Sequence, residues 1–320
     1  RRWLESDETA NAIDEDWKCD LDDVTELILG TGASDSSRLL ASCLSGPVDI
    51  DKLDYLQRDS LHAGVPYGRN FDGQRLLGAL CVHPNKPQLA VNSKGRTAAE
   101  IMVFSRYVMF SEVYWHHAVR AATAMLQRAV FLLQHRLDLE ASFRLTDALW
   151  IEMICRAAEG SVAEPLVAGL FGPRRRLYKR VAEFNVLDGH EVHKQLARRP
   201  YWWLVLLSER LAERLCRSTG LAVTAADVLV DAPPVKLEVD INVDIVSSSH
   251  DGSAPTVRPL GEVSPVASVL AHQQFDDHVK QVRVFVHPTL RDDLRTGVPT
   301  VDAWRQHLLA AMNETDQEIA

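Results

Sequence analysis

The sequence has few cysteines and lacks any long run of apolar residues. Its five cysteines are widely spaced, and no CxxC pair occurs. This usage excludes a disulfide framework and a zinc ribbon, and it is typical of a reducing compartment, so we expect a cytoplasmic protein. The apolar run 201–207 ends at Ser208, Glu209 and Arg210. It is too short to cross a membrane, so no membrane partner is expected.

Basic charge is also in short supply. The chain has 35 Lys and Arg against 44 Asp and Glu, a formal net charge of -9. A general nucleic-acid-binding surface would make the domain basic, so that class is excluded, although a local basic pocket for a small polyanion is not. The chain begins with Arg1 instead of Met and shows no signal-peptide pattern. We therefore expect it to begin inside a longer protein.

The spacing of apolar residues predicts a mainly α-helical fold. From 65 to 97, Pro and Gly punctuate two apolar runs, which is typical of a β-hairpin inserted among helices. After residue 220, β-branched residues alternate with polar ones, as in strands. We therefore expect a helical body over residues 1–220 and a small α+β appendage over 221–320. Helices are predicted within 1–30 and at 34–45, 48–62, 98–136, 140–158, 162–170, 174–184, 189–196, 200–217 and 301–313, and strands at 76–82, 89–91, 228–230, 235–246 and 281–286.

One predicted helix carries an unusual row of side chains. Asp51, Tyr55 and Asp59 fall at i, i+4 and i+8, and His62 follows three residues later. This spacing places two carboxylates, a phenol and an imidazole along one helix face. A solvated face usually mixes Lys and Glu, whereas this one offers metal ligands and hydrogen-bonding groups.

The same segment reads D-x-D-K-x-D-Y-x-x-R-D from Asp49 to Asp59. It resembles the last signature of the HD-domain phosphohydrolases, in the branch of the deoxynucleoside triphosphate triphosphohydrolases. Weaker similar stretches follow in the family's order, and together they cover about residues 1–290. These stretches are Asn70-Phe71-Asp72, Arg106 through Tyr114 to His117, Leu145-Thr146-Asp147 and Arg176-Leu177-Tyr178-Lys179.

The resemblance implies an HD-domain helical body and a divalent metal cofactor, which could be Mg, Mn, Fe or Zn. It implies hydrolysis of a nucleoside triphosphate with release of triphosphate. Asp51 would be the metal ligand, and Lys52 would reach a substrate phosphate. Tyr55 and Asp59 would contact the deoxyribose.

On the helix predicted over 98–136, the resemblance assigns Arg106 to phosphate, while Tyr114 packs against the sugar and crowds a 2′-hydroxyl. The family often has Gln after that Tyr, whereas this chain has Trp115. This departure leaves the preference for deoxynucleotides and the base contacts open.

On the helix predicted over 48–62, Arg58 is expected to form an ion pair with Asp54, four residues earlier.

The family's remaining metal ligands, a His and an adjacent His-Asp pair, have no counterpart in a helical setting here. The sequence's HD dipeptide, His250-Asp251, lies in a Ser/Gly loop. Asp51 would thus be one of four ligands, the catalytic residues remain unknown, and this chain alone is expected to be inactive.

Two alternatives stay open. The chain could belong to a nucleotide-binding regulatory module without hydrolysis, or to a phosphohydrolase for another phosphate ester. The implied partners are a nucleotide substrate, a nucleotide effector and further copies of the chain. The basic cluster of Arg174, Arg175 and Arg176 could bind an effector phosphate or form a solvated helix terminus.

Overall fold

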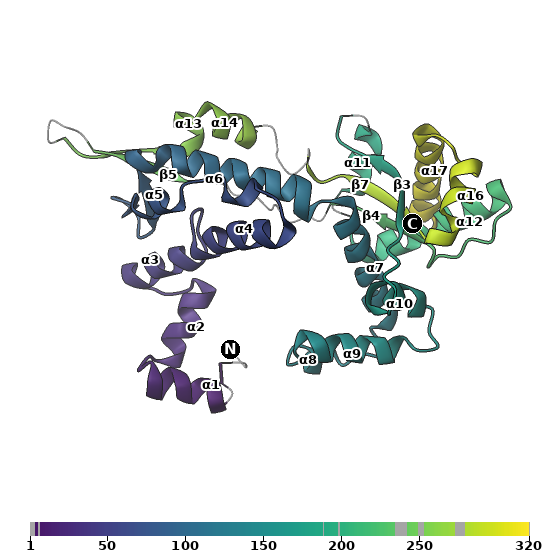
Figure 1. The fold of residues 1–320 in the computed structure, drawn as a ribbon, viewed down its shortest axis with the longest axis horizontal. Coiled ribbons are helices and arrows are strands. Elements are labelled where there is room, and N and C mark those ends of the chain that lie inside the picture. Colours follow the sequence, from purple (N-terminus) through teal and green to yellow (C-terminus); the bar gives the residue numbers. More distant parts are fainter. Residues whose placement is uncertain are drawn as a thin grey trace. The chain divides into compact units, whose positions relative to one another are not determined.

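A computed structural model describes residues 4, 5, 7–187, 189–197, 199–233, 242–248, 253–272 and 279–319. The chain divides into two compact units, each made of two stretches of sequence. The first unit comprises 1–110 and 238–275, and the second comprises 111–237 and 276–320. Both units are mainly helical with a small sheet, which confirms the predicted fold class (Figure 1).

The first unit pairs a helical bundle with a four-stranded sheet of order β1-β2-β5-β6. The predicted hairpin forms β1 and β2, and β5 adds to β2 in parallel, with Val91 opposite Ile245. Residues 234–241, which hold most of the strand predicted at 235–246, lie outside the described residues. The elements are α1 Asp7–Asn11, the π-helix η1 Ala12–Asp16, α2 Leu21–Leu29, α3 Asp35–Leu44, α4 Ile50–Ala63, η2 Tyr67–Arg69, α5 Gly73–Leu77, β1 Leu80–Val82, β2 Leu89–Asn92, η3 Ser93–Gly95, α6 Arg96–Met109, β5 Asp244–Ser247, β6 Thr256–Pro259, α13 Leu260–Val263 and α14 Pro265–His272.

Helix α4 carries the row of site candidates, and its ends are set by local chemistry. The Asp49 carboxylate accepts a hydrogen bond from the Lys52 backbone N–H at 2.8 Å and caps the first turn. Gly64, at φ 69°, ends the helix in the left-handed conformation. Leu56 and Ser60 form its buried side, against which η2 packs closely at Gly68.

The second unit is a three-layer arrangement around an antiparallel sheet of order β3-β7-β4. Val282, Val284 and Val286 of β7 pack into a core with α12 and α17, whereas Phe285 faces a second core with α7, α9 and α10. The elements are the π-helix η4 Phe110–Tyr114, whose first residue belongs to the first unit, α7 His117–Leu133, α8 Leu139–Ser142, α9 Asp147–Ala158, α10 Glu164–Phe171, β3 Lys179–Phe184, α11 His190–Leu196, α12 Tyr201–Thr219, β4 Val228–Asp231, β7 Val282–Val286, η5 Pro288–Leu290, α16 Arg291–Gly297 and α17 Val301–Ile319.

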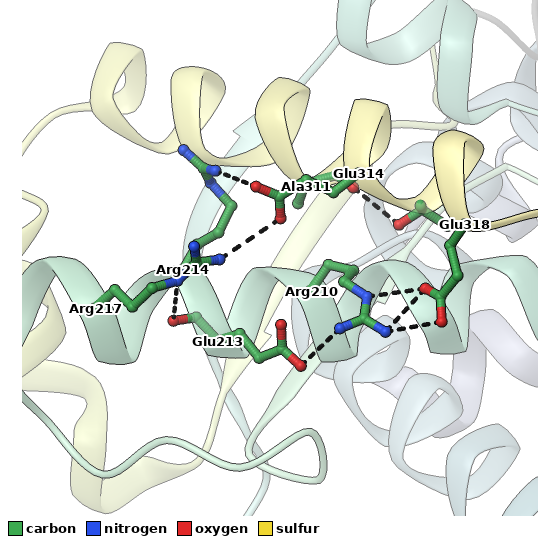
Figure 2. Close-up of polar contacts among 8 residues, drawn as sticks. Arg210, Glu213, Arg214, Arg217, Ala311, Glu314 and Glu318 are labelled. Carbon is green, nitrogen blue, oxygen red and sulfur yellow. Dashed lines mark hydrogen bonds and ion pairs between the residues drawn. The ribbon is translucent and has the colours of Figure 1, made fainter.

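Helices α12 and α17 are joined by a network of ion pairs (Figure 2). Arg210 of α12 binds Glu318 of α17 through Nε and Nη2, at 3.0 and 2.9 Å. Arg214 reaches Glu314 at 2.6 Å, and Arg217 lies 3.7 Å from the same carboxylate. These contacts fix α17 along α12 above their shared apolar core.

Several expectations differ from the structure, three of them in ways that change the architecture. The helix predicted over 98–136 is broken into α6, η4 and α7, because the chain leaves helical geometry around Trp115 and His116. Residues 174–184 do not form a helix: 179–184 are strand β3, because they pair with β7. Strands after residue 220 do not form an appendage of their own, since β4 and β7 complete a sheet with β3, while β5 and β6 complete a sheet with the hairpin.

Candidate functional site

Asp51, Tyr55 and Asp59 lie on one continuous helix, α4, as the sequence predicts. Asp51 is exposed in the first turn, and the other two are half-buried. Within the described part of the chain, Asp51 makes no ion pair or side-chain hydrogen bond, so its carboxylate is available to a ligand. The row therefore combines an accessible charge with two partly enclosed polar groups.

The Lys52 side chain contacts residues at the N-terminus of α4, the helix to which Lys52 belongs. Its Nζ donates to the Gly46 carbonyl oxygen at 2.7 Å and forms an ion pair with Asp49. The Lys52 side chain keeps 17% exposure, while that of Asp49 keeps 4%. An ammonium group has three donors, so two are used here and one remains for another acceptor.

Arg58 is paired with Asp54, which confirms the expectation from their spacing. Its Nε lies 2.9 Å from Asp54 Oδ2, and Nη1 lies 3.4 Å from Asp59 Oδ1. Arg58 thus borders the site row through Asp59. Both Arg58 and Asp54 are exposed, so the pair contributes little to stability.

Arg106 lies on α6, which packs against α4 in the first unit. Only 3% of Arg106 is exposed. A buried guanidinium carries a large desolvation cost, and its planar donors suit an anionic group such as a phosphate. The first unit therefore holds Asp51, Tyr55, Asp59 and Arg106 on two packed helices, whereas Tyr114 belongs to the second unit.

The described residues do not by themselves form a metal centre. No three His, Cys, Asp or Glu side chains among them lie close enough together to hold a metal ion. Asp51 is a suitable oxygen ligand for a hard divalent cation, but one carboxylate does not hold a catalytic metal. His250 and Asp251 lie outside the described residues.

A charged cluster in the second unit was not found by sequence reasoning. Asp231 of β4, Arg283 of β7 and Glu183 of β3 lie opposite one another across the sheet, on the side facing α7. Arg283 Nε donates to Glu183 at 2.6 Å. Arg120 of α7 binds both carboxylate oxygens of Asp231, at 2.9 and 2.5 Å. The signal available in the sequence was the single charge in each of the apolar runs of β4 and β7, Asp231 and Arg283.

The cluster perturbs two titrating groups. Burial lowers the pKa of His117, and the charges of His116, Arg180 and Arg283 lower it further against the opposing effect of Glu183. Burial alone would raise the pKa of the Glu183 carboxyl, but hydrogen bonds and charges from Arg283 and Arg180 outweigh it and hold this pKa below its usual range. The local potential is therefore positive.

The basic cluster Arg174, Arg175 and Arg176 is not part of a helix. It lies in the exposed connection between α10 and β3. Arg180, which follows on β3, is ion-paired with Glu183. Among the described residues, no helix is both long and apolar enough to cross a membrane.

Comparison with known families gives a match over most of the chain. Residues 71–300 match the family model described as the HD associated region. An uncharacterized protein of Methanocaldococcus jannaschii is 30% identical over 235 residues, which cover 71% of this chain and 46% of that protein. An HD domain-containing protein of Acanthamoeba polyphaga mimivirus is 24% identical over 180 residues, covering 48% of this chain and 37% of that protein. The chain thus spans less than half the length of these relatives.

Two solved structures share the fold. A hypothetical protein from Aquifex aeolicus aligns with a TM-score of 0.62 and 23% identity, covering 91% of this chain and 71% of that one. A phosphohydrolase from Bacteroides thetaiotaomicron aligns with a TM-score of 0.53 and 19% identity, covering 86% of this chain and 69% of that one. At these identities the likeness concerns the fold.

Proposed function

Because this chain belongs to the HD associated region family, and so to the HD superfamily, we propose that it is the substrate-binding part of a nucleotide phosphohydrolase. The observation that carries the proposal is the pairing of α4 with α6 in one unit. This packing combines the row Asp51, Tyr55 and Asp59 with the buried Arg106. The Bacteroides neighbour of similar fold is named a phosphohydrolase, which supports the same reaction class.

Each residue has a role that fits its chemistry. Arg106 and the third N–H of Lys52 bind substrate phosphates, since both present positive charge in partly desolvated surroundings. Asp59 accepts a hydrogen bond from the 3′-hydroxyl of the sugar, beside Tyr55. Tyr114 packs on the sugar. A carboxylate that accepts from a substrate hydroxyl discriminates strongly against analogues that lack this hydroxyl. Such an analogue leaves the carboxylate charge unpaired.

The reaction is hydrolysis of a nucleoside triphosphate or deoxynucleoside triphosphate, with triphosphate as the product. A divalent metal, Mg, Mn, Fe or Zn, would supply phosphate-charge neutralisation when bound. Asp51 would contribute one of its ligands. Homo-oligomerisation and binding of a nucleotide effector belong to the same proposal.

A second candidate function is nucleotide binding without hydrolysis. It is favoured by the fact that no group of three metal-ligating side chains comes together among the described residues. A third, hydrolysis of another phosphate ester, rests on Trp115 where the triphosphohydrolases often carry Gln.

The deciding experiment uses the full-length protein. It is incubated with each divalent metal and a panel of deoxy- and ribonucleoside triphosphates, and the release of nucleoside and triphosphate is measured alongside nucleotide binding. Metal-dependent turnover with triphosphate as product supports the proposal. Binding without turnover under every metal supports the regulatory module, and neither binding nor turnover contradicts both.

A further inference from the structure

Helices α2 and α3 of the first unit leave their apolar side chains largely exposed. Within these two fully described helices, only Thr25 is buried. Ile28 and Leu29 at the end of α2 are 58% and 67% exposed, and Leu40 of α3 is 55% exposed. Apolar side chains gathered on an exposed surface often mark an interaction site. The end of α2 is therefore a surface that a partner can cover.

The same surface is hollowed. A cavity of about 510 Å³ opens between the end of α2, helix α3 and the turn of the β1–β2 hairpin, and we call it the α2–α3 groove. Leu27, Ile28 and Leu29 belong to its apolar wall. Among the described residues, the charged side chains that line it are Arg38 and Lys86. Ligand pockets typically have volumes of about 300–1,000 Å³, so the groove has room for an aromatic ring.

The two cations of the α2–α3 groove stay accessible. Arg38 is paired with Asp35 at 2.6 Å, and its side chain is 52% exposed. Lys86 Nζ lies 3.8 Å from Asp244, and the Lys86 side chain is 58% exposed. Both cations have further N–H donors for another acceptor. The described residues that line the cavity include neither of the two carboxylates, so its lining is positively charged. The groove therefore fits an apolar group that is flanked by carboxylates.

A segment with this chemistry is exposed on the first unit itself. Trp17 is 67% exposed, and it directly follows Asp14, Glu15 and Asp16. These three carboxylates are exposed and form no ion pair with any residue that the structure describes. We call residues 14–17 the Trp17 knob. Tryptophan is the residue type most enriched among the side chains that dominate the binding energy of protein interfaces.

Trp17 is presented on a folded turn. Its backbone N–H donates to the Ala12 carbonyl oxygen at 3.0 Å and closes the last turn of η1. Ile13 of η1 is buried, and its carbonyl oxygen accepts a hydrogen bond from the Cys19 N–H at 3.0 Å. Lys18 has φ 56°, a left-handed conformation that a residue other than glycine keeps only where its surroundings fix it. A side chain held in this way loses little freedom on binding.

We propose that two copies of this chain form a two-fold dimer in which the Trp17 knob of each copy fills the α2–α3 groove of the other. The indole packs on Ile28 and Leu29, and the carboxylates of the knob face Arg38 and Lys86. The charges favour a second copy as the occupant, because each chain carries both complementary halves and reciprocal exchange closes the assembly. The inference rests on the homo-oligomerisation included in the proposed function and names its interface.

The first test removes the indole of the knob. In Trp17→Ala, the dimer dissociation constant of the full-length protein should rise about 30-fold or more, as is typical of losing a tryptophan anchor. The constant is measured by sedimentation equilibrium. Trp202→Ala, at an exposed tryptophan of the second unit, is the matched control and should leave it unchanged. Because both side chains are exposed, both variants should fold as wild type does.

The second test asks whether the contact joins two molecules. Leu29→Glu places a negative charge in the groove, against the acidic knob of the partner, and should weaken the dimer about as much as Trp17→Ala. An equal mixture of the two variants should form a heterodimer, in which the intact knob of one chain meets the intact groove of the other. Because one of the two contacts is regained, this heterodimer should bind about fivefold or more tightly than either variant binds itself.

The third test concerns charge. Lys86→Glu should raise the dissociation constant about fivefold to tenfold, because it places like charges against each other across the interface. Lys94→Glu, at an exposed lysine of the same unit, is the control and should change the constant little. Asp16→Lys added to Lys86→Glu should recover part of the loss, since the exchange of signs restores the attraction.

The possible failures are distinguishable. A monomeric wild type would overturn both this inference and the proposed homo-oligomerisation, while nucleotide hydrolysis, assayed separately, decides the proposed reaction. A dimer that persists unchanged in Trp17→Ala would overturn this inference alone, because its interface would lie elsewhere. If the two variants failed to associate in the mixture, reciprocal exchange would be contradicted. A monomer with slow amide exchange over residues 27–30 would show that another segment of the same polypeptide covers the groove, which excludes the second copy.

Discussion

Lys52 is ion-paired with Asp49, the residue that caps the helix on which Lys52 lies. The pair is largely shielded from water, and Asp49 also accepts from the Gly46 backbone N–H at 3.1 Å. Lys52 therefore stabilises the start of α4 whether or not it touches a substrate. The position of Asp51, one residue earlier, depends on this arrangement.

Substitution of the two partners separates the structural and the binding role of Lys52. Lys52→Met and Asp49→Asn both break the ion pair, and each should lower the free energy of unfolding by about 1–2 kcal/mol. Only Lys52→Met removes positive charge from the site. Nucleotide affinity, measured by titration calorimetry on full-length protein, should therefore fall about tenfold in Lys52→Met and change little in Asp49→Asn. Equal affinities in the two variants would mean that Lys52 is purely structural.

Asp51→Asn tests the metal ligand that we propose on α4. Affinity of the full-length protein for Mn²⁺ should decrease by more than the ~10–100-fold typical of losing an outer-shell partner, because a charged ligand is removed. The cost in stability should be small, about 0.3–1 kcal/mol, since Asp51 is exposed and interacts only with the helix terminus. Asp54→Asn on the same helix is the control. Undiminished Mn²⁺ affinity in Asp51→Asn would exclude it as a ligand.

Gly68 allows η2 to pack closely against the C-terminal half of α4. A Cβ at this position would lie 1.9 Å from the Leu56 carbonyl oxygen, and the Gly68 N–H donates to Ser60 Oγ at 3.2 Å. Gly68→Ala should cost more than about 3 kcal/mol in chemical denaturation, because the obstacle is backbone that has to shift. Gly261→Ala in α13 is the control, because a Cβ at this position would meet no other part of the protein within 4 Å. This substitution should be neutral or mildly stabilising. If Gly68→Ala and Gly261→Ala were equally stable, the close approach of Gly68 to the Leu56 backbone would be contradicted.

The sequence predicted α4 well because its determinants are local. An apolar face, a break at Gly46-Pro47 and a stop at Gly64 define the helix without any distant partner. The row Asp51, Tyr55 and Asp59 follows from helical spacing alone. The contacts of Lys52 did not follow, since the sequence does not tell whether Asp49, three residues earlier, caps the helix or points away.

The errors fall where distant contacts override the local pattern. Between residues 98 and 136 no Gly or Pro announces a break, and the turn at Trp115 is held by Arg283 of a strand far along the chain. Leu177, Val181 and Phe184 are spaced as on a helix, yet pairing with β7 makes this segment a strand. Charged residues in strands, such as Asp231, could not be matched to partners before the sheet was known.

His307 of α17 is expected to make the stability of the second unit depend on pH. Burial lowers the pKa of His307 from its usual 6.5, and the charge of Arg214 lowers it further. Arg214 is the arginine that reaches Glu314 in Figure 2. A histidine whose pKa is lower in the folded state takes up its proton more readily when unfolded. Its contribution to stability is therefore complete above pH about 6.5 and decreases as pH falls below that value.

The expected result is a smaller acid sensitivity in His307→Gln. The free energy of unfolding, measured by urea denaturation, should fall less between pH 7 and pH 5.5 in this variant than in wild type. His135→Gln, at an exposed position of the same unit, should retain the wild-type pH dependence. Because Arg214 adds to the effect, Arg214→Gln should also reduce the acid sensitivity, by less than His307→Gln does. If the free energy of unfolding fell equally with pH in wild type and His307→Gln, another group would be responsible for the loss of stability below pH 7.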